Sequence, residues 1–311
     1  MKGMNTARVN AYAKLNLTLD ITGAENGFHL LDSLVVTVDL FDKIVVKKRK
    51  DRLVSVVMHG MGSEQIPPEC NNAQRAGEAF VERFSTTGAQ ITVYKNIPVG
   101  AGMGGSSADA AGVLNALAKL YRISDTGALK ELADSLGSDT GYLLEGGWAR
   151  IRGRGEQVTP IADMPPMHFL ALAPRSGVST AACYAAYDRL HADTVPSEAD
   201  MPRTERVLEL LLSGNPAWAA RLTGNALFGA AKELNPEVRE AYLALKEFSP
   251  LGVFMTGSGS ACCAAFETRE LCEWAKSRYK GKFRAYVLKS VEPKKIKESK
   301  NPFVLGEGEG E

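Results

Sequence analysis

The sequence predicts a two-domain protein of the α/β (α+β) class, with helices and strands mixed along the whole chain. Its 311 residues suffice for about two domains, and 45% hydrophobic and 23% charged residues are typical of globular proteins. Alternating apolar stretches, which indicate strands, are interleaved with apolar residues at helical spacing. The proline-rich stretch 160–166 separates two such halves. We therefore expect domains over residues 1–160 and 161–291, followed by a disordered tail over 292–311.

The first domain is predicted to begin with strands and to continue with helices. An apolar residue stands at every second position from Val9 to Ile21, as one face of a strand requires. Apolar residues at helical spacing, including Phe80 and Phe84, predict a helix over 71–84. Further strands are predicted over 33–40, 43–47, 54–58, 89–94 and 146–151, further helices over 107–120 and 126–136, and turns over 23–27 and 137–141.

The second domain is predicted to surround an apolar strand over 168–173. A helix over 179–190 should begin at Ser179 or Thr180, because serine and threonine cap helix N-termini. Helices are also predicted over 204–212, 216–222, 225–234, 236–248 and 269–279, strands over 253–256, 261–267 and 285–289, and loops over 174–178 and 197–202.

Charge and cysteine content narrow the class of function. The 37 Lys and Arg residues balance 36 Asp and Glu, so the net charge of +1 favours neither a nucleic-acid nor a membrane partner. No apolar run approaches the roughly 18 residues that span a bilayer, and the N-terminus lacks the apolar segment of a signal peptide. The five cysteines are odd in number, and the four histidines lack zinc-ligand spacing. We therefore expect a cytoplasmic protein with reduced thiols.

A glycine-rich loop between a predicted strand and a predicted helix is the most informative stretch. It reads Pro98-Val99-Gly100-Ala101-Gly102-Met103-Gly104-Gly105-Ser106-Ser107. Glycines let backbone amides approach a bulky anion, and the helix start adds free N–H groups and partial positive charge. The pattern predicts a phosphate-binding loop; the alternative is a glycine-rich turn before an ordinary helix. It is no Walker A motif, and the acidic residue of a dinucleotide site is missing about 20 residues on.

Three further features suit transfer of a phosphoryl group, which requires an oriented hydroxyl and neutralised charge. Asp139 can accept the hydroxyl proton, although a residue in such a small-residue stretch is also an ordinary turn residue. Lys14, on the first predicted strand, can keep that carboxylate ionised or can be a solvated strand residue. The stretch 256–260, Thr-Gly-Ser-Gly-Ser, is either a second loop that lets backbone approach a ligand or a tight hairpin.

Four blocks that occur in one order give the chain a resemblance to a known family. They are Ala13-Lys14-Leu15-Asn16, the glycine loop from Pro98 to Ser107, Gly137-Ser138-Asp139, and Thr256-Gly257-Ser258-Gly259. Together they resemble the GHMP kinase superfamily over about residues 9–267. The resemblance implies ATP-dependent phosphorylation of a small alcohol, with ATP and Mg²⁺. It also implies a ribosomal-protein-S5-like N-terminal domain and a ferredoxin-like C-terminal domain.

Further blocks are similar to the branch of that superfamily that serves non-mevalonate isoprenoid synthesis. They are Asn26-Gly27-Phe28-His29-Leu30-Leu31, Gly153-Arg154-Gly155-Glu156 with Thr159-Pro160, and Ser179-Thr180 with Tyr184. The resemblance implies the C2 hydroxyl of 4-diphosphocytidyl-2-C-methyl-D-erythritol, a cytidylylated sugar alcohol, as acceptor. Ser106-Ser107 lie one residue earlier than in that branch. Two alternatives stay open: a GHMP kinase for another alcohol or sugar, and a nucleotide-binding relative without turnover.

The resemblance also implies roles for individual residues. Asp139 matches the catalytic base, and Lys14 matches the lysine paired with it. The residues that match or adjoin substrate contacts are Asn16, Phe28, His29, Thr180, Tyr184, Gly257 and Ser258, of which Phe28, His29 and Tyr184 would hold the cytosine ring. The residues that match ATP contacts are Asn72, Pro98, Gly100, Ala101, Gly102, Met103, Gly104, Gly105, Ser106 and Ser107. Neither the Mg²⁺ ligands nor the oligomeric state follows from the sequence.

Overall fold

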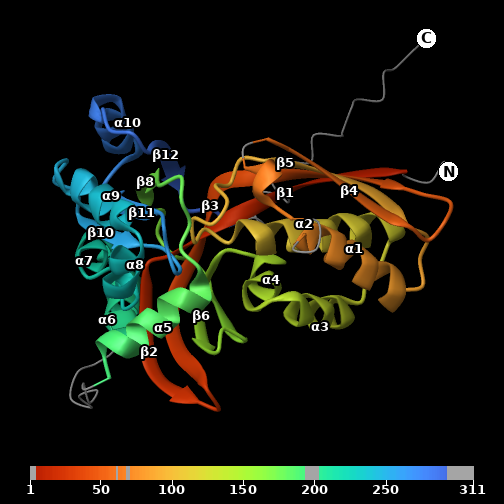
Figure 1. Ribbon diagram of the computed structural model, residues 1–311, viewed down its shortest axis with the longest axis horizontal. Coiled ribbons are helices and arrows are strands. Elements are labelled where there is room, and N and C mark those ends of the chain that lie inside the picture. Colours follow the sequence, from red (N-terminus) through yellow and green to blue (C-terminus); the bar gives the residue numbers. More distant parts are fainter. Residues whose placement is uncertain (1–4, 61, 68–70, 193–202, 293–311) are drawn as a thin grey trace, which may run out of the picture.

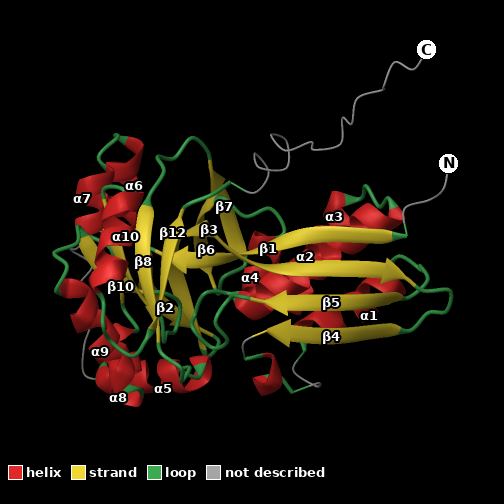
Figure 2. Ribbon diagram, turned by 90° about the horizontal axis from the view of Figure 1, so that it is seen from above, coloured by secondary structure: helices red, strands yellow, loops and turns green. Residues whose placement is uncertain are grey.

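One long strand organises the first sheet. The structure, a computed structural model, describes residues 5–60, 62–67, 71–192 and 203–292. Strand β3 (Phe28–Lys48) is 21 residues long and runs through both halves of the molecule (Figure 2). Its antiparallel neighbours are β1 (Thr6–Asn16), β2 (Thr18–Glu25), β5 (Ala89–Lys95) and β6 (Trp148–Gly153). Three outer strands complete the eight: β4 (Val54–Gly60) on β5, β7 (Gln157–Ile161) on β6, and β9 (Gly224–Asn225) on β2.

The predicted strands at the N-terminus are present, but their division was wrong in two places. The stretch 9–21 is divided between β1 and β2, with a bend at Leu17, while 33–40 and 43–47 form one continuous strand. The residues between the two predicted strands, Phe41 and Asp42, pair with Tyr12 and Ala11 of β1. The irregularity in this pairing lies just before them, because Tyr12 pairs with Phe41 whereas Lys14 pairs with Thr37, and β3 continues through it. The predicted turn over 23–27 narrows to residues 26 and 27.

Helices of the first half pack against this sheet and against one another, as Figure 1 shows. They are α1 (Asn72–Arg83), α2 (Gly105–Tyr121), α3 (Thr126–Leu136) and α4 (Ser138–Leu143), preceded by the 3₁₀ helix η1 (Ser63–Gln65). The predicted turn over 137–141 was wrong, because these residues begin α4. The helix packs on α3, and a Cβ on Gly141 would meet only the ends of the surface side chains of Asp134 and Lys130. Asp139 therefore lies in the first turn of a helix.

The second half contains a four-stranded antiparallel sheet of order β10-β11-β8-β12, with helices beside it (Figure 1). Its strands are β8 (His168–Ala173), β10 (Gly252–Met255), β11 (Cys262–Phe266) and β12 (Arg284–Lys289). Its helices are α5 (Thr180–Leu190), α6 (Arg203–Leu212), α7 (Pro216–Arg221), α8 (Phe228–Leu234), α9 (Pro236–Lys246) and α10 (Arg269–Arg278). This strand order, with α10 between β11 and β12, follows the predicted ferredoxin-like pattern.

Most predicted elements of the second half are confirmed, and α5 begins after its predicted cap Ser179. One helix begins later than predicted, at Phe228, because Gly224 and Asn225 pair with β2 as β9. The predicted division at residues 160 and 161 stays a prediction, since β9 carries the second half into the first sheet. The predicted loop 197–202 lies outside the described residues, and so does the predicted tail beyond residue 292.

Two glycine loops from different halves of the chain meet back to back. Ala261 N donates to Ala101 O at 3.1 Å, and Lys14 N donates to Met103 O at 3.0 Å. A Cβ on Gly102, whose φ is +74°, would lie 2.2 Å from Thr256 O, and one on Gly257 would lie 2.7 Å from Gly102 O. Only glycine permits this approach at both positions. The contact brings the 98–107 loop, the end of β1 and the 256–260 loop together.

Candidate active site

A cavity of about 630 Å³ lies where these loops meet. It is bounded by the glycine loop, the end of β1, the start of α4, the β6–β7 turn, the start of α5 and the 256–260 loop. Of the predicted site residues, those that line it are Lys14, Asn16, Asn72, Pro98, Gly100, Ala101, Gly102, Met103, Gly104, Gly105, Ser106, Ser107, Asp139, Thr180, Tyr184, Gly257 and Ser258. The structure thus gathers segments up to about 240 residues apart in the chain.

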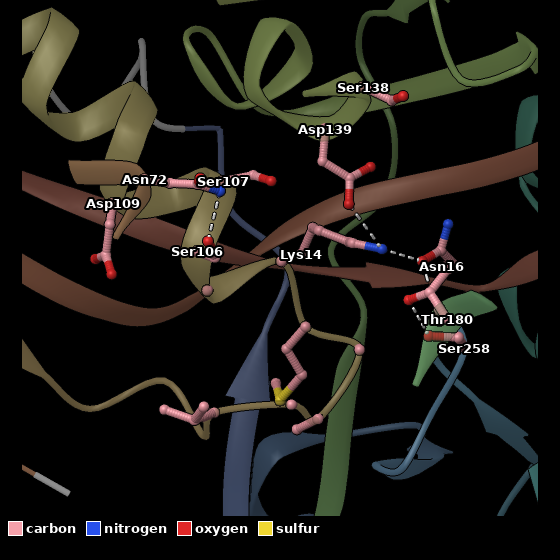
Figure 3. A pocket seen from close by; sticks show the side chains of 18 of the residues that line it. Lys14, Asn16, Asn72, Ser106, Ser107, Asp109, Ser138, Asp139, Thr180 and Ser258 are labelled. Carbon is pink, nitrogen blue, oxygen red and sulfur yellow. Dashed lines mark hydrogen bonds and ion pairs between the residues drawn. The ribbon is translucent and has the colours of Figure 1, made fainter. Parts of the chain in front are cut away.

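The glycine loop ends at the N-terminus of α2, a helix of 17 residues. Gly100, Gly102 and Gly104 all have positive φ, and Gly104 precedes the helix without a side-chain cap. The first N–H groups of α2 therefore have no capping acceptor, and they carry the partial positive charge of the helix start. Asn72 of α1 donates to Ser106 Oγ at 2.7 Å (Figure 3). This arrangement suits an anionic ligand.

Lys14 and Asp139 form an ion pair at the centre of the cavity. Lys14 Nζ lies 3.4 Å from Asp139 Oδ2, and Figure 3 shows the carboxylate pointing toward the ammonium. The lysine side chain is 5% exposed, whereas that of Asp139 is 35% exposed. The lysine stem runs against Gly104, where a Cβ would lie 2.9 Å from Lys14 Cγ. The carboxylate is thus held by a buried cation and still open to a ligand.

Asn16 connects this pair to the second glycine loop. Its Oδ1 accepts hydrogen bonds from Lys14 Nζ and from Gly257 N, and its Nδ2 donates to Ser33 Oγ at 2.8 Å. Its backbone N–H donates to Thr256 Oγ1 at 3.0 Å. Both the oxygen and the nitrogen of the Asn16 side-chain amide therefore form hydrogen bonds within the protein. Its predicted contact with the substrate stays a prediction.

Aromatic residues gather at one side of the cavity. The rings of His29 and Tyr184 are stacked with centroids 4.8 Å apart, and His29 Nε2 lies 2.6 Å from Asp188 Oδ1. Burial raises the pKa of Tyr184 to about 12, so its hydroxyl stays protonated at neutral pH. Phe28 is 55% exposed, and the Arg154 guanidinium lies 5.0 Å from its ring centroid. Phe28 and His29 contact the cavity wall through Arg154 and Tyr184 rather than lining the cavity.

Two small residues of the second half close this side of the cavity. Thr180, the first residue of α5, lies with its hydroxyl 2.9 Å from Ser258 Oγ (Figure 3). Asn225 supports the same loop, because its Nδ2 donates to the carbonyl oxygens of Met255 and Gly257. The stretch 256–260 connects the antiparallel strands β10 and β11, as the hairpin alternative requires, and it also lines the cavity. Its predicted contact with a ligand stays a prediction.

Two charged residues of the cavity wall were not predicted. Lys95 and Asp109 line the cavity and pair with each other at 2.6 Å, and Asp42 pairs with the same lysine. A signal was present in the sequence: Lys95 continues the buried phase of Ile91 and Val93 along its strand. A charge on an apolar face indicates a buried partner.

No metal site was predicted in detail, and the described residues contain no group of three or more His, Cys, Asp or Glu side chains arranged to hold a metal ion. A Mg²⁺ ion that arrives with a nucleotide is held largely by phosphate oxygens and water, so it needs no such group. Within the described residues no helix is both long enough and apolar enough to cross a membrane.

Family profiles match both halves of the chain. The profile of the GHMP kinases N terminal domain matches residues 71–148, and that of the GHMP kinases C terminal domain matches residues 207–280. The 4-diphosphocytidyl-2-C-methyl-D-erythritol kinase of Mycolicibacterium smegmatis is 38% identical over 267 residues, covering 84% of this chain and 81% of the relative. That of Cutibacterium acnes is 34% identical over 278 residues, covering 85% and 86%.

Solved structures are similar over almost the whole chain. A crystal structure of 4-(cytidine 5'-diphospho)-2C-methyl-D-erythritol kinase has a TM-score of 0.73 and 32% identity, covering 91% of this chain and 99% of its own. Homoserine kinase from Cytophaga hutchinsonii has a TM-score of 0.69 at 16% identity, covering 94% and 96%. The second likeness shows that the fold is shared, whereas the first extends to the sequence.

Proposed function

The chain belongs to the GHMP kinases and, within them, to the family of 4-diphosphocytidyl-2-C-methyl-D-erythritol kinases, and from this premise we propose how its cavity performs the reaction. The γ-phosphate of ATP is transferred to the C2 hydroxyl of 4-diphosphocytidyl-2-C-methyl-D-erythritol. The bond between the C2 oxygen and γ-phosphorus forms, and the bond from γ-phosphorus to its bridging oxygen breaks. The observation that carries the proposal is the Lys14–Asp139 pair in a cavity shared with the glycine loop.

Asp139 is the base of this proposal. Its carboxylate is 35% exposed in the cavity, so it can reach an incoming hydroxyl and accept its proton as the new bond forms. Lys14 pairs with that carboxylate, and its charge offsets the negative charge that develops on the transferred group. Asn16 holds Lys14 in place through Oδ1.

The glycine loop is the proposed site for the phosphates of ATP. Backbone N–H groups at the start of α2 would donate to phosphate oxygens, and the partial charge of the helix favours the anion. Asn72 and Ser106, which already share a hydrogen bond, lie on the α1 side of this site. Mg²⁺ belongs to the proposal as the counter-ion that ATP would bring, and when bound it would lower the repulsion between the phosphates and the incoming oxygen.

The aromatic group is the proposed site for the cytosine ring. Phe28 presents an exposed face, and Tyr184 and His29 form a stacked pair on the cavity side. Aromatic faces bind a nucleobase by stacking, and a histidine adds hydrogen bonds. Thr180 and Ser258 lie at the same side of the cavity.

The compartment we propose is the cytoplasm, in keeping with four described cysteines that are buried and unbridged.

The experiment that tests this proposal measures ADP release from ATP and Mg²⁺, with the cytidylylated methylerythritol as acceptor. We expect turnover by the wild-type protein and a loss of about 10²–10⁴-fold in kcat for Asp139→Asn, the range of general-base catalysis. Asp134→Asn is the matched control, because Asp134 pairs with Lys130 on the surface of α3. If ADP binds but no turnover occurs, the cytidylylated methylerythritol is not the substrate, and other alcohols should then be assayed as acceptors. Undiminished turnover by Asp139→Asn would reject the base.

A further inference from the structure

A second cluster of charges lines the cavity and has no part in the proton transfer described above. Lys95 at the end of β5 donates to Asp42 of β3 and to Asp109 of α2. All three side chains are at most 2% exposed. Figure 3 shows Asp109 apart from the Lys14–Asp139 pair, on the helix that follows the glycine loop. Because Lys95 and Asp109 reach the cavity wall, the charge of this cluster acts on whatever the loop binds.

The two carboxylates of the cluster are not equivalent. Asp42 Oδ1 accepts the backbone N–H groups of Asn96 and Ile97, at 2.5 Å and 2.9 Å, while Oδ2 accepts from Lys95. Asp109 Oδ2 accepts from Lys95 at 2.6 Å, but Oδ1 is buried without any hydrogen-bond partner. Hydrogen bonds to the charged form favour that form. Asp109, which has fewer hydrogen bonds, is therefore the carboxylate of the cluster that can hold a proton.

We propose that Asp109 is a positioning residue for the nucleotide and holds a proton while the nucleotide is bound, so that the cluster presents no net negative charge to the phosphates. The inference rests on the proposed function, in that the glycine loop is taken as the nucleotide site. It does not depend on which alcohol accepts the phosphoryl group. Protonated Asp109 can hydrogen-bond to the neighbouring carboxylate of Asp42, which favours the protonated form.

Electrostatics explains why the proton and the nucleotide should bind together. With all three groups ionised, two carboxylates and one ammonium leave a net charge of −1 in a site shielded from solvent. Burial raises the pKa of Asp109 to about 8; the attraction of Lys95 opposes this rise, and the repulsion of Asp42 adds to it. Anionic phosphates at the helix start disfavour the ionised form further. By linkage, a ligand that raises a pKa binds more weakly once that group has lost its proton.

The charges that set the state of Asp109 are those of Asp42 on β3 and of Lys95 at the end of β5. The elements packed against α2 also include α3, where Lys130 and Asp134 pair with each other at the surface. On β1 and α4, Lys14 and Asp139 pair with each other. On α1, the Arg75 guanidinium donates to Asn72 Oδ1. Burial raises the pKa values of the described cysteines, so their thiols do not titrate near pH 8.

The test measures the Kd of ADP, with Mg²⁺ present, between pH 7.5 and pH 9.5 by isothermal titration calorimetry. For the wild-type protein we expect affinity to fall above pH 8, approaching about tenfold per pH unit for one linked proton. Asp109→Asn keeps a neutral, hydrogen-bonding side chain, so its affinity should stay nearly constant over this range. Asp134→Asn, which leaves the cavity unchanged, should follow the wild-type curve. Parallel curves for wild type and Asp109→Asn would overturn the proposal.

A second measurement needs no variant at position 109. Calorimetry of ADP binding at pH 8.5, in buffers of different ionisation enthalpy, should show uptake of a substantial fraction of one proton by the wild-type protein. Asp42→Asn should abolish this uptake, because Asp109 then becomes the sole anionic partner of Lys95 and stays ionised. Absence of uptake by the wild-type protein would overturn the proposal. Failure of ADP to bind would reject the nucleotide site itself, whereas normal proton-linked binding without turnover would reject only the acceptor.

Discussion

Two lysine–aspartate clusters line one cavity, and they differ most in their exposure to solvent. In the first, Lys14 holds Asp139 at 3.4 Å, and the carboxylate side chain is 35% exposed. In the second, Lys95 holds Asp42 and Asp109, and no side chain is more than 2% exposed. The residue types are the same, so sequence composition does not distinguish the two clusters.

The comparison teaches that burial decides what a paired carboxylate can do. Asp139 keeps an open side toward the cavity and can exchange a proton with a ligand. Asp42 is enclosed by Lys95 and two backbone N–H groups, so it joins β3, β5 and the entry of the glycine loop. Asp109 lies between these cases, since it is buried and lacks a partner for one oxygen. Each cluster can be broken by removing its lysine, and the outcomes should differ in kind.

Removal of the buried lysine should have the largest effect. Lys95→Met leaves two carboxylates buried without their cation, and breaking a buried pair in this way costs about 3–5 kcal/mol of the free energy of unfolding. Urea denaturation measures the loss. Lys130→Met is the matched control, because Lys130 pairs with Asp134 at the surface and should contribute less than about 1 kcal/mol. Equal losses for the two variants would contradict the distinction by burial.

Removal of the open lysine should affect catalysis rather than folding. Lys14→Met leaves Asp139 partly hydrated, so the fold should persist, but it removes a cation near the transferred phosphate. We expect kcat to fall about 10²–10³-fold, as when one electrostatic donor is removed from an active site, while the Kd of ADP stays within a few-fold. The steady-state assay of ADP release measures the first quantity. A kcat within twofold of wild type would contradict the proposed role.

Substitutions at the aromatic side of the cavity extend this comparison, because they should weaken binding of the acceptor substrate and leave binding of ATP unchanged. Phe28→Ala should lower kcat/KM for the cytidylylated acceptor about 5–150-fold, since stacking on an aromatic ring contributes about 1–3 kcal/mol per base. His29→Ala should act in the same direction. The KM of ATP should not change, and this is the internal control. Near-normal kcat/KM in both variants would exclude the cytidylyl group as the feature recognised.

The smallest effect is expected at Asp188, which pairs with His29 but is itself 59% exposed. Asp188→Asn should raise the KM for the acceptor by about two- to five-fold, because exposed ion pairs contribute only about 0.2–1 kcal/mol. The change should be absent in the His29→Ala background, where the partner is missing. A full effect in that background would show that Asp188 acts on its own.

Much of the fold followed from local patterns in the sequence. The bounds of α3 and β8 agree with the prediction, because each element carries its own apolar periodicity and its own start signal. Where prediction failed, a tertiary contact overrode the local signal. The two predicted strands within β3 are joined by pairing with β1, and the stretch predicted as a turn begins α4, which packs on α3.

The candidate site divides in the same way. The glycine loop, Lys14 and Asp139 stand in short blocks that a sequence pattern can describe, and the structure brings them to one cavity. In the second cluster, Lys95 is 53 positions from Asp42 and 14 positions from Asp109 in the sequence, and no motif connects the three residues. Their shared burial depends on how β3, β5 and α2 pack, and no single segment of the sequence contains that information.

The close approach of the two glycine loops has a consequence for how this sequence can vary. Gly102 and the carbonyl of Thr256 are 154 residues apart in the chain, yet a single added methyl group on the glycine would overlap that carbonyl. Gly257 meets the carbonyl of Gly102 in the same manner. A side chain at either glycine is therefore tolerated only if the other loop moves, so the two loops constrain each other's sequence. Recombination between relatives that exchanged one half of the chain would have to preserve the fit at this seam.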